Sequence, residues 1–100
     1  MTEFERIDRG RQAGHELTLL EPAIDSFVSA FMTRQRELAR KEPWAAQKVT
    51  NLSIAMNIAE DVRDYLKALV QDGELAHNDL SRKRKIEQMS PEQRRYADAL

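Results

Sequence analysis

Cysteine is absent from this chain, and several other residue types are scarce. Without cysteine the chain has no disulfide and no thiolate metal site, which is typical of proteins made in a reducing cytoplasm. Glycine and proline occur three times each and aromatic residues make up 6%, a composition of helices rather than of sheets and turns. No run of about 18 apolar residues could cross a bilayer, and the first residues lack the pattern of a signal peptide. We therefore expect a cytoplasmic all-α protein that makes no contact with a membrane.

Charged side chains, by contrast, are abundant. They make up 33% of the 100 residues, and the two signs nearly balance at a formal net charge of −1. The molecule as a whole is therefore not attracted electrostatically to nucleic acid or to a membrane surface. A chain of this length fits one domain with one core.

The most informative segment runs from Pro43 to Asp72, because no glycine or further proline interrupts it. At about 100° per residue, its apolar side chains form two neighbouring stripes on a helix. The first stripe consists of Ala45, Val49, Leu52, Met56, Ala59, Leu66 and Val70. The second consists of Ala55, Ile58, Val62, Tyr65 and Leu69. Together they cover on the order of 200° of the helix surface, against about 100° in an ordinary surface helix, so this helix needs neighbours on two sides.

The three prolines mark positions where helices can begin, because proline is tolerated at the first helical position. They predict a long antiparallel hairpin of two helices, at about 22–41 and 43–72, with a shorter helix before it. Gly10 and Gly14 each weaken that N-terminal helix by about 0.5–1 kcal/mol relative to alanine. We therefore expect the chain to fray before Ala13.

The long helix is expected to stop at Asp72-Gly73, with Gly73 in the left-handed conformation of a C-cap. A short fourth helix would then begin near Leu75. On this basis residues 1–80 form a single helical domain, and residues 81–100 form a basic, partly mobile helical tail.

The tail carries six cationic side chains against three acidic ones. Within it, Ser90-Pro91-Glu92-Gln93 matches the start signal of one more short helix. The cations, which are candidates for contacts with phosphates, are Arg82, Lys83, Arg84, Lys85, Arg94 and Arg95. Three roles stay open for them: a solvated surface, contacts with nucleic acid, or contacts with an acidic protein surface.

Self-association is the expected use of the wide apolar surface on the long helix, because an N-terminal helix with two glycines would cover it poorly. We expect a homo-oligomer, with Phe27 and Phe31 of the preceding helix as an alternative contact. The candidate self-association residues are Leu52, Met56, Ile58, Val62, Tyr65, Leu66 and Leu69. Trp44, which follows Pro43 at the turn, either caps the core of the hairpin or anchors a protein partner.

Three carboxylates, Glu60, Asp61 and Asp64, share one side of the long helix. A divalent metal would need further ligands from a second element, and the sequence pairs none with them. Arg63 and Lys67 lie within one turn and are expected to neutralise the cluster. The interpretation is a solvated acidic surface, with docking of a partner as the alternative.

Catalytic signatures are missing. His15 and His77 are the only histidines, and neither lies in a metal-binding pattern. A joint site would need the first and fourth helices to meet. The serines lie in no nucleophile elbow, and no glycine-rich loop could hold a phosphate. We therefore predict no catalytic residue, no metal site and no cofactor.

The order of helix breaks and apolar positions resembles one class of known proteins. Its elements are Arg9-Gly10-Arg11-Gln12-Ala13, Leu20-Glu21-Pro22, Phe27 to Phe31, Trp44, a long helix, and Asp72-Gly73-Glu74-Leu75-Ala76. This order resembles short all-helical accessory proteins of tailed bacteriophages, which are often encoded among head and packaging genes. The likeness covers roughly residues 9 to 80. It implies no chemistry, only a setting: a virion-associated or head-assembly protein, located in the host cytoplasm or the virion.

The leading hypothesis is therefore a non-enzymatic helical interaction protein that self-associates through its long helix. One alternative is a nucleic-acid-associated protein that uses the basic tail. The other is a phage-encoded inhibitor that masks a host protein with its acidic helix surface.

Overall fold

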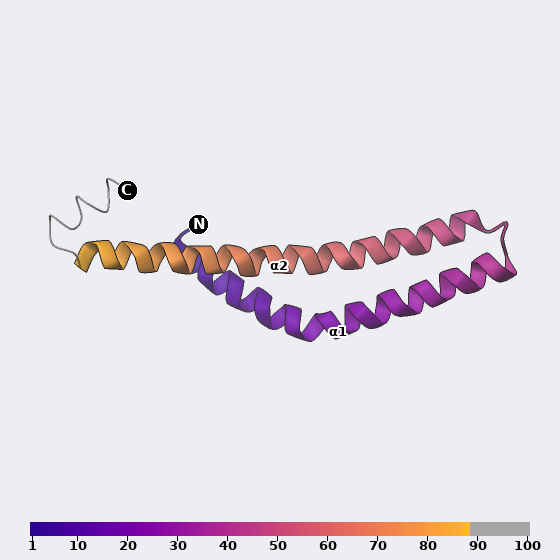
Figure 1. Ribbon diagram of the computed structural model, residues 1–100, viewed down its shortest axis with the longest axis horizontal. Helices are drawn as coiled ribbons and strands as arrows, with labels where there is room; N and C mark the ends of the chain where they lie inside the picture. The colour runs from indigo at the N-terminus through magenta and orange to yellow at the C-terminus, as the bar shows by residue number, and fades with distance from the viewer. Residues whose placement is uncertain (89–100) are drawn as a thin grey trace.

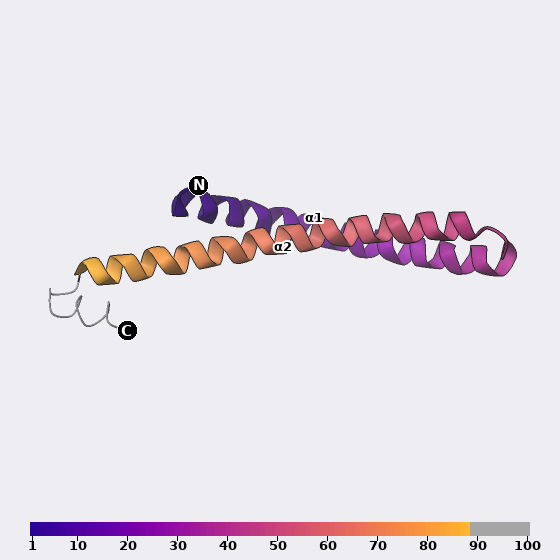
Figure 2. The same ribbon diagram turned by 90° about the horizontal axis from the view of Figure 1, so that it is seen from above.

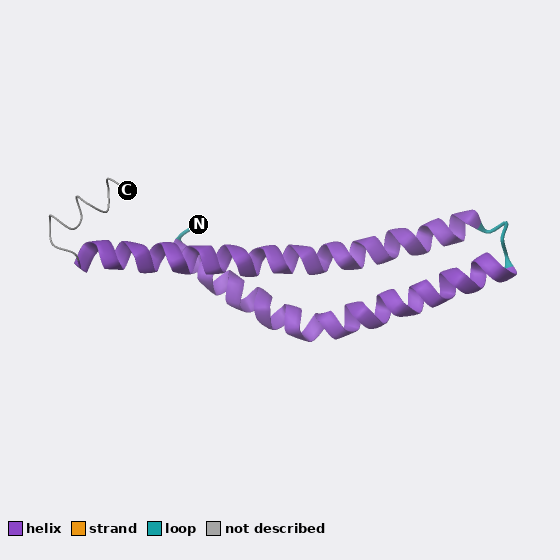
Figure 3. Ribbon diagram, viewed as in Figure 1, coloured by secondary structure: helices purple, strands orange, loops and turns teal. Residues whose placement is uncertain are grey.

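The computed structural model describes residues 1–88, which form two long helices joined by a short turn (Figure 1). Helix α1 spans Glu3–Lys41 and helix α2 spans Ala46–Gln88. The two run antiparallel along one another, and the whole described part is helix apart from the turn and the first residues (Figure 3). The predicted all-α antiparallel hairpin is confirmed.

Helix α1 begins and ends with local signals. The Thr2 hydroxyl accepts a hydrogen bond from the Glu5 amide at 3.2 Å, which satisfies a backbone donor that the first turn would leave unpaired. At the other end, the Glu42 amide donates to the Leu38 carbonyl at 2.7 Å. Arg40 and Lys41 lie in the last turn, where cations favour the negative end of the helix dipole.

The separate N-terminal helix expected before Pro22 is not observed. Helix α1 passes through Gly10, Gly14 and Pro22 without interruption and is ordered from Glu3 onward. Proline has no N–H to donate to the carbonyl of Thr18, and its ring crowds that carbonyl, so a helix that continues through proline bends. Figure 1 shows such a bend near the middle of α1. Helix α1 nevertheless continues to Lys41, and buried residues lie on both sides of Pro22, Ala13 before it and Ile24 after it.

The helix stop expected at Asp72-Gly73 is also wrong. Helix α2 continues to Gln88, and no glycine among the described residues has a positive φ. Gly73 serves a different purpose: it lies opposite Gly10 where the helices approach most closely, and an added Cβ on Gly73 would come within 2.9 Å of the Gly10 Cα. The boundary expected between residues 80 and 81 therefore falls inside α2.

The turn consists of Glu42 to Ala45, with Pro43 and Trp44 at its centre. The Ala45 amide donates to the Glu42 carbonyl at 2.9 Å, which closes the turn. Proline suits this place because its fixed φ is compatible with a tight turn. The chain thereby reverses direction within four residues.

Apolar side chains at seven-residue spacing hold the two helices together. In α1 these are Leu17, Ile24, Phe31 and Leu38, and in α2 they are Leu52, Ala59 and Leu66. Such spacing is typical of helices that pack along a common seam. Figure 2 shows the ribbons of α1 and α2 overlapping near the middle of the molecule, and Figure 1 shows the N-terminal part of α1 coming up against α2. There the contact shifts to the small residues Gly10, Ala13, Gly73 and Ala76, all of them buried.

The resulting core is thin. Among the described residues, the buried hydrophobic side chains are Ala13, Ile24, Leu52, Leu66 and Ala76, and no large side chain is fully buried. Two helices alone cannot surround a side chain, so this core is expected for a hairpin. Much apolar surface is left in contact with water.

Candidate functional site

The seven candidate self-association residues divide between two environments. Leu52 and Leu66 are buried against α1, at 9% and 6% exposure, and Met56 and Leu69 are half-buried. The remaining three face solvent: Ile58 is 59%, Val62 45% and Tyr65 63% exposed. Helix α1 thus covers one of the two predicted stripes of α2 and leaves most of the other uncovered.

Helix α1 adds apolar side chains beside the uncovered stripe. Leu20, Ala23, Ile24 and Phe27 line a shallow hollow of about 250 Å³ together with Ala59 and Val62 of α2. Leu20 and Phe27 are 42% and 37% exposed. We define the apolar face by its six exposed residues, Leu20, Ala23, Phe27, Ile58, Val62 and Tyr65. The sequence did not reveal that both helices contribute to it, because that depends on their register.

The opposite flank of the hairpin is polar. Arg63 pairs with Asp25, and the Lys67 ammonium lies 3.9 Å from the Glu21 carboxylate. The expectation that Arg63 and Lys67 neutralise the nearby carboxylates is therefore wrong, because both reach across to α1. Glu60, Asp61 and Asp64 are exposed, and no ion pair to them is found within residues 1–88.

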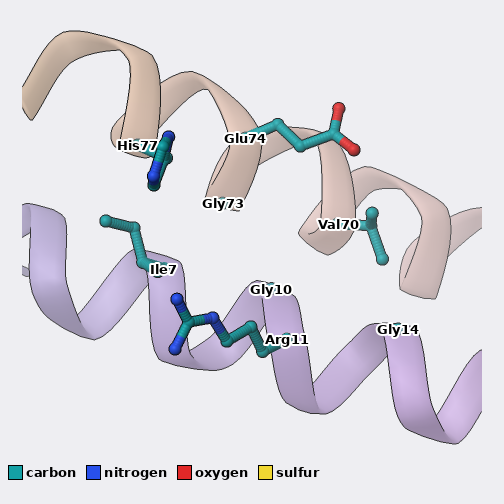
Figure 4. Close-up of a pocket in the computed structure, with 8 residues that line it drawn as sticks. All are labelled: Ile7, Gly10, Arg11, Gly14, Val70, Gly73, Glu74 and His77. Carbon is teal, nitrogen blue, oxygen red and sulfur yellow. The ribbon is translucent and has the colours of Figure 1, made fainter. Parts of the chain in front are cut away.

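At the open end, α1 and α2 enclose a groove of about 320 Å³ whose floor is formed by the glycine backbones (Figure 4). Ile7 and His77 point toward one another across it, and Val70 lines its far part. His15 does not line this groove, although its helix and that of His77 do meet. No group of three metal-ligating side chains occurs among the described residues. The groove follows from the close approach of Gly10 and Gly73, so its origin is structural.

An ion pair on the other side of this close approach links the same two segments. The Arg6 guanidinium donates from Nε to one Asp72 carboxylate oxygen at 3.1 Å and from Nη2 to the other at 2.8 Å. This bidentate hydrogen bonding holds the pKa of Asp72 below its ordinary value of 3.8. Bidentate geometry also fixes the relative position of the helices more tightly than a single contact would.

The basic residues predicted for phosphate contacts are only partly described. Arg82, Lys83, Arg84 and Lys85 are exposed in the last turns of α2. Lys83 pairs with Glu3, and this hydrogen bond lowers the pKa of the Glu3 carboxyl. Arg84 borders a polar hollow with Phe4 and Arg11. Arg94, Arg95 and the helix start predicted at Ser90 lie outside the described residues.

Trp44 does not cap the core of the hairpin. Its side chain is 77% exposed at the tip of the turn, so the capping interpretation is wrong. Beside the tip, a hollow of about 450 Å³ is lined by Phe31, Arg34, Leu38, Glu42, Lys48, Asn51 and Leu52. Periodicity does not predict this hollow, because its residues come from both helices.

No family model, no curated protein and no solved structure matches the chain. Neither described helix combines the length and the apolar character needed to cross a membrane.

Proposed function

We propose that this chain is a non-enzymatic helical interaction protein that self-associates through its apolar face and acts in assembly. The sequence resembles accessory proteins of tailed bacteriophages, and on that basis we propose a virion-associated or head-assembly protein. The observation that carries it is the apolar face itself. Six neighbouring residues from two helices form that face, and they face solvent.

The exposed area is large enough to accommodate a partner. The chain exposes 7879 Å² of surface and has a mass of 11.6 kDa. A compact monomer of that mass would expose about 5,800 Å². The excess of roughly 2,000 Å² exceeds the surface of about 800 Å² that each partner contributes to a standard interface. The hairpin therefore has ample surface for a stable dimer.

The distribution of polarity fits a four-helix arrangement. One flank of the hairpin carries Ile58, Val62 and Tyr65, whereas the other carries ion pairs and carboxylates. Two hairpins that meet through their apolar faces would form a core surrounded by four helices, as in helical bundles. Ala23 and the shallow hollow next to Val62 would let side chains of the second copy interdigitate.

Light scattering coupled to size exclusion tests this proposal. We expect the wild-type chain to elute with the mass of a dimer or larger oligomer. Val62→Glu should shift it to the monomer mass, because the new charge would be buried without a partner in the interface. Asn57→Glu is the matched control, since it adds the same charge at an exposed position away from that face. A monomeric wild-type protein at high micromolar concentration would refute self-association.

A second candidate is a nucleic-acid-associated role for the basic residues. Arg82, Arg84 and Lys85 are exposed and lie close together at the end of α2, which supports this alternative. Binding that weakens steeply with salt, and that is lost when these three are replaced by glutamine, would favour it.

A further inference from the structure

The tip of the hairpin differs in charge from the rest of the molecule. Residues 26–59 contain five cations, Arg34, Arg36, Arg40, Lys41 and Lys48, and two acids, Glu37 and Glu42, a local net charge of +3. The whole chain has a net charge of −1. From Pro43 to Ala59 there is no acidic side chain. The closed end of the hairpin is therefore a cationic region on a slightly acidic protein.

The hollow beside the tip combines an apolar floor with a cationic rim. Its floor is formed by Phe31, Leu38 and Leu52, and its rim carries Arg34 and Lys48. Lys48 has one loose ion pair, 3.7 Å from the Glu42 carboxylate. Arg34 has no ion pair among residues 1–88. At about 450 Å³ the hollow lies within the range of about 300–1,000 Å³ that is usual for binding pockets.

Trp44 supplies a large contact surface in the turn, two residues after Glu42, which lines this hollow. Its side chain is 77% exposed, and the turn that carries it is closed by the hydrogen bond from Ala45 to Glu42. A tryptophan side chain has only two rotatable χ angles and therefore loses little conformational freedom for the area it buries, and tryptophan is frequent at the centres of interfaces.

We propose that the hollow and Trp44 together bind an acidic, amphipathic segment of a protein partner. The apolar floor would receive one or two large apolar side chains of the segment, and Arg34 and Lys48 would pair with its carboxylates. An apolar floor favours such a segment over a nucleic acid, whose outer surface is phosphate and sugar. A single aromatic residue also provides no continuous platform for stacked bases. The proposal does not depend on self-association.

Titration with synthetic peptides tests this inference. The first peptide is a helical segment of about 20 residues with leucine or phenylalanine at positions i, i+3, i+4 and i+7 and glutamate elsewhere. The second has the same composition with the apolar residues scattered. Trp44 is the only tryptophan of the chain, so its emission reports docking directly. We expect the Trp44 emission to shift to shorter wavelength when the first peptide binds. The second peptide should bind at least about tenfold more weakly.

Charge reversal identifies the site. Arg34→Glu and Lys48→Glu should each weaken binding of the first peptide about tenfold or more. Fluorescence anisotropy of that peptide, labelled with a fluorophore, would measure this. Arg36→Glu is the matched control, because Arg36 is an exposed arginine of the same helix that does not line the hollow, and it should change binding less than about threefold. Circular dichroism would verify that each variant is folded.

Three results would overturn the inference: equal binding of both peptides, equal effects of Arg34→Glu and Arg36→Glu, or no binding at all. Tighter binding of an oligothymidylate or of phosphatidylserine vesicles, lost with Arg34→Glu and Lys48→Glu, would assign the tip to a nucleic acid or a membrane surface instead.

Discussion

Gly10 and Gly73 face one another so closely that neither helix has room for a side chain at that point. A Cβ added to Gly10 would lie 2.9 Å from the Gly73 Cα and 3.1 Å from the Leu69 carbonyl oxygen. Both neighbouring atoms belong to backbone, which cannot move aside as a flexible side chain could. The two glycines thus set the separation of α1 and α2 at the open end.

Replacing either of these glycines by alanine should destabilise the hairpin, although alanine is the better helix former. We expect Gly73→Ala to lower the free energy of unfolding by about 1–3 kcal/mol, because the helices must separate locally. Urea denaturation followed by circular dichroism would measure this. Gly14→Ala is the control: its added Cβ would meet only Val70, at 3.8 Å, so it should stabilise by about 0.5–1 kcal/mol. Equal effects of the two substitutions would contradict the close contact.

The ion pair between Arg6 and Asp72 should make stability depend on pH. Because the folded-state pKa of Asp72 is lowered from 3.8, the ionised carboxylate stabilises the fold above that value. The contribution is lost as the pH falls through the folded-state pKa. Asp72→Asn should therefore be less stable than wild type near neutral pH, and the difference should shrink below about pH 4. Asp64→Asn, at an exposed position without an ion pair, should show no such convergence.

Pro22 should cost the hairpin stability, because the helix around it lacks one backbone hydrogen bond. We expect Pro22→Ala to raise the free energy of unfolding by about 1–3 kcal/mol as α1 straightens and that bond forms. The bend also shapes the hollow that includes Leu20 and Val62, so self-association should weaken in the same variant. Thermal denaturation and light scattering of one sample would test both. A stability unchanged from wild type would mean that packing against α2 requires the bend.

A polar contact lies within the apolar seam near the turn. The Gln35 amide donates to the Val49 carbonyl at 2.9 Å and to the Ser53 hydroxyl at 2.6 Å. A double-mutant cycle of Gln35→Ala and Ser53→Ala should give a coupling free energy of about 0.5–1.5 kcal/mol. Gln47→Ala with Asn51→Ala is the comparison, since that hydrogen bond is exposed, and its coupling should be near zero.

Periodicity was sufficient to predict the fold class but not the ends of the helices. The spacing of Leu52 and Leu66 predicted a helix that packs against a neighbour, and the break at Glu42-Pro43 predicted the hairpin. Local preference alone predicts a helix start at Pro22 and a helix stop at Gly73. Tertiary contact decides otherwise at Gly73, where the opposite backbone excludes a side chain, whereas α1 simply continues through the exposed Pro22.

The candidate site was predictable in part for a similar reason. The stripe containing Ile58, Val62 and Tyr65 follows from helical geometry, and the structure leaves it exposed as an interaction surface requires. The residues that α1 adds, Leu20 and Phe27, depend on the register between helices. Exposure of Trp44 depends on the direction of one turn, which periodicity does not determine.

The partners of the long-range contacts lie ever farther apart in the chain toward the open end. Gln35 and Ser53 are 18 residues apart, Asp25 and Arg63 are 38 apart, Arg6 and Asp72 are 66 apart, and Glu3 and Lys83 are 80 apart. Each contact formed near the turn shortens the loop that the next one must close. Folding should consequently proceed as a zipper from the turn outward, and amide exchange with solvent should be slowest near Leu52 and fastest at the termini of the hairpin.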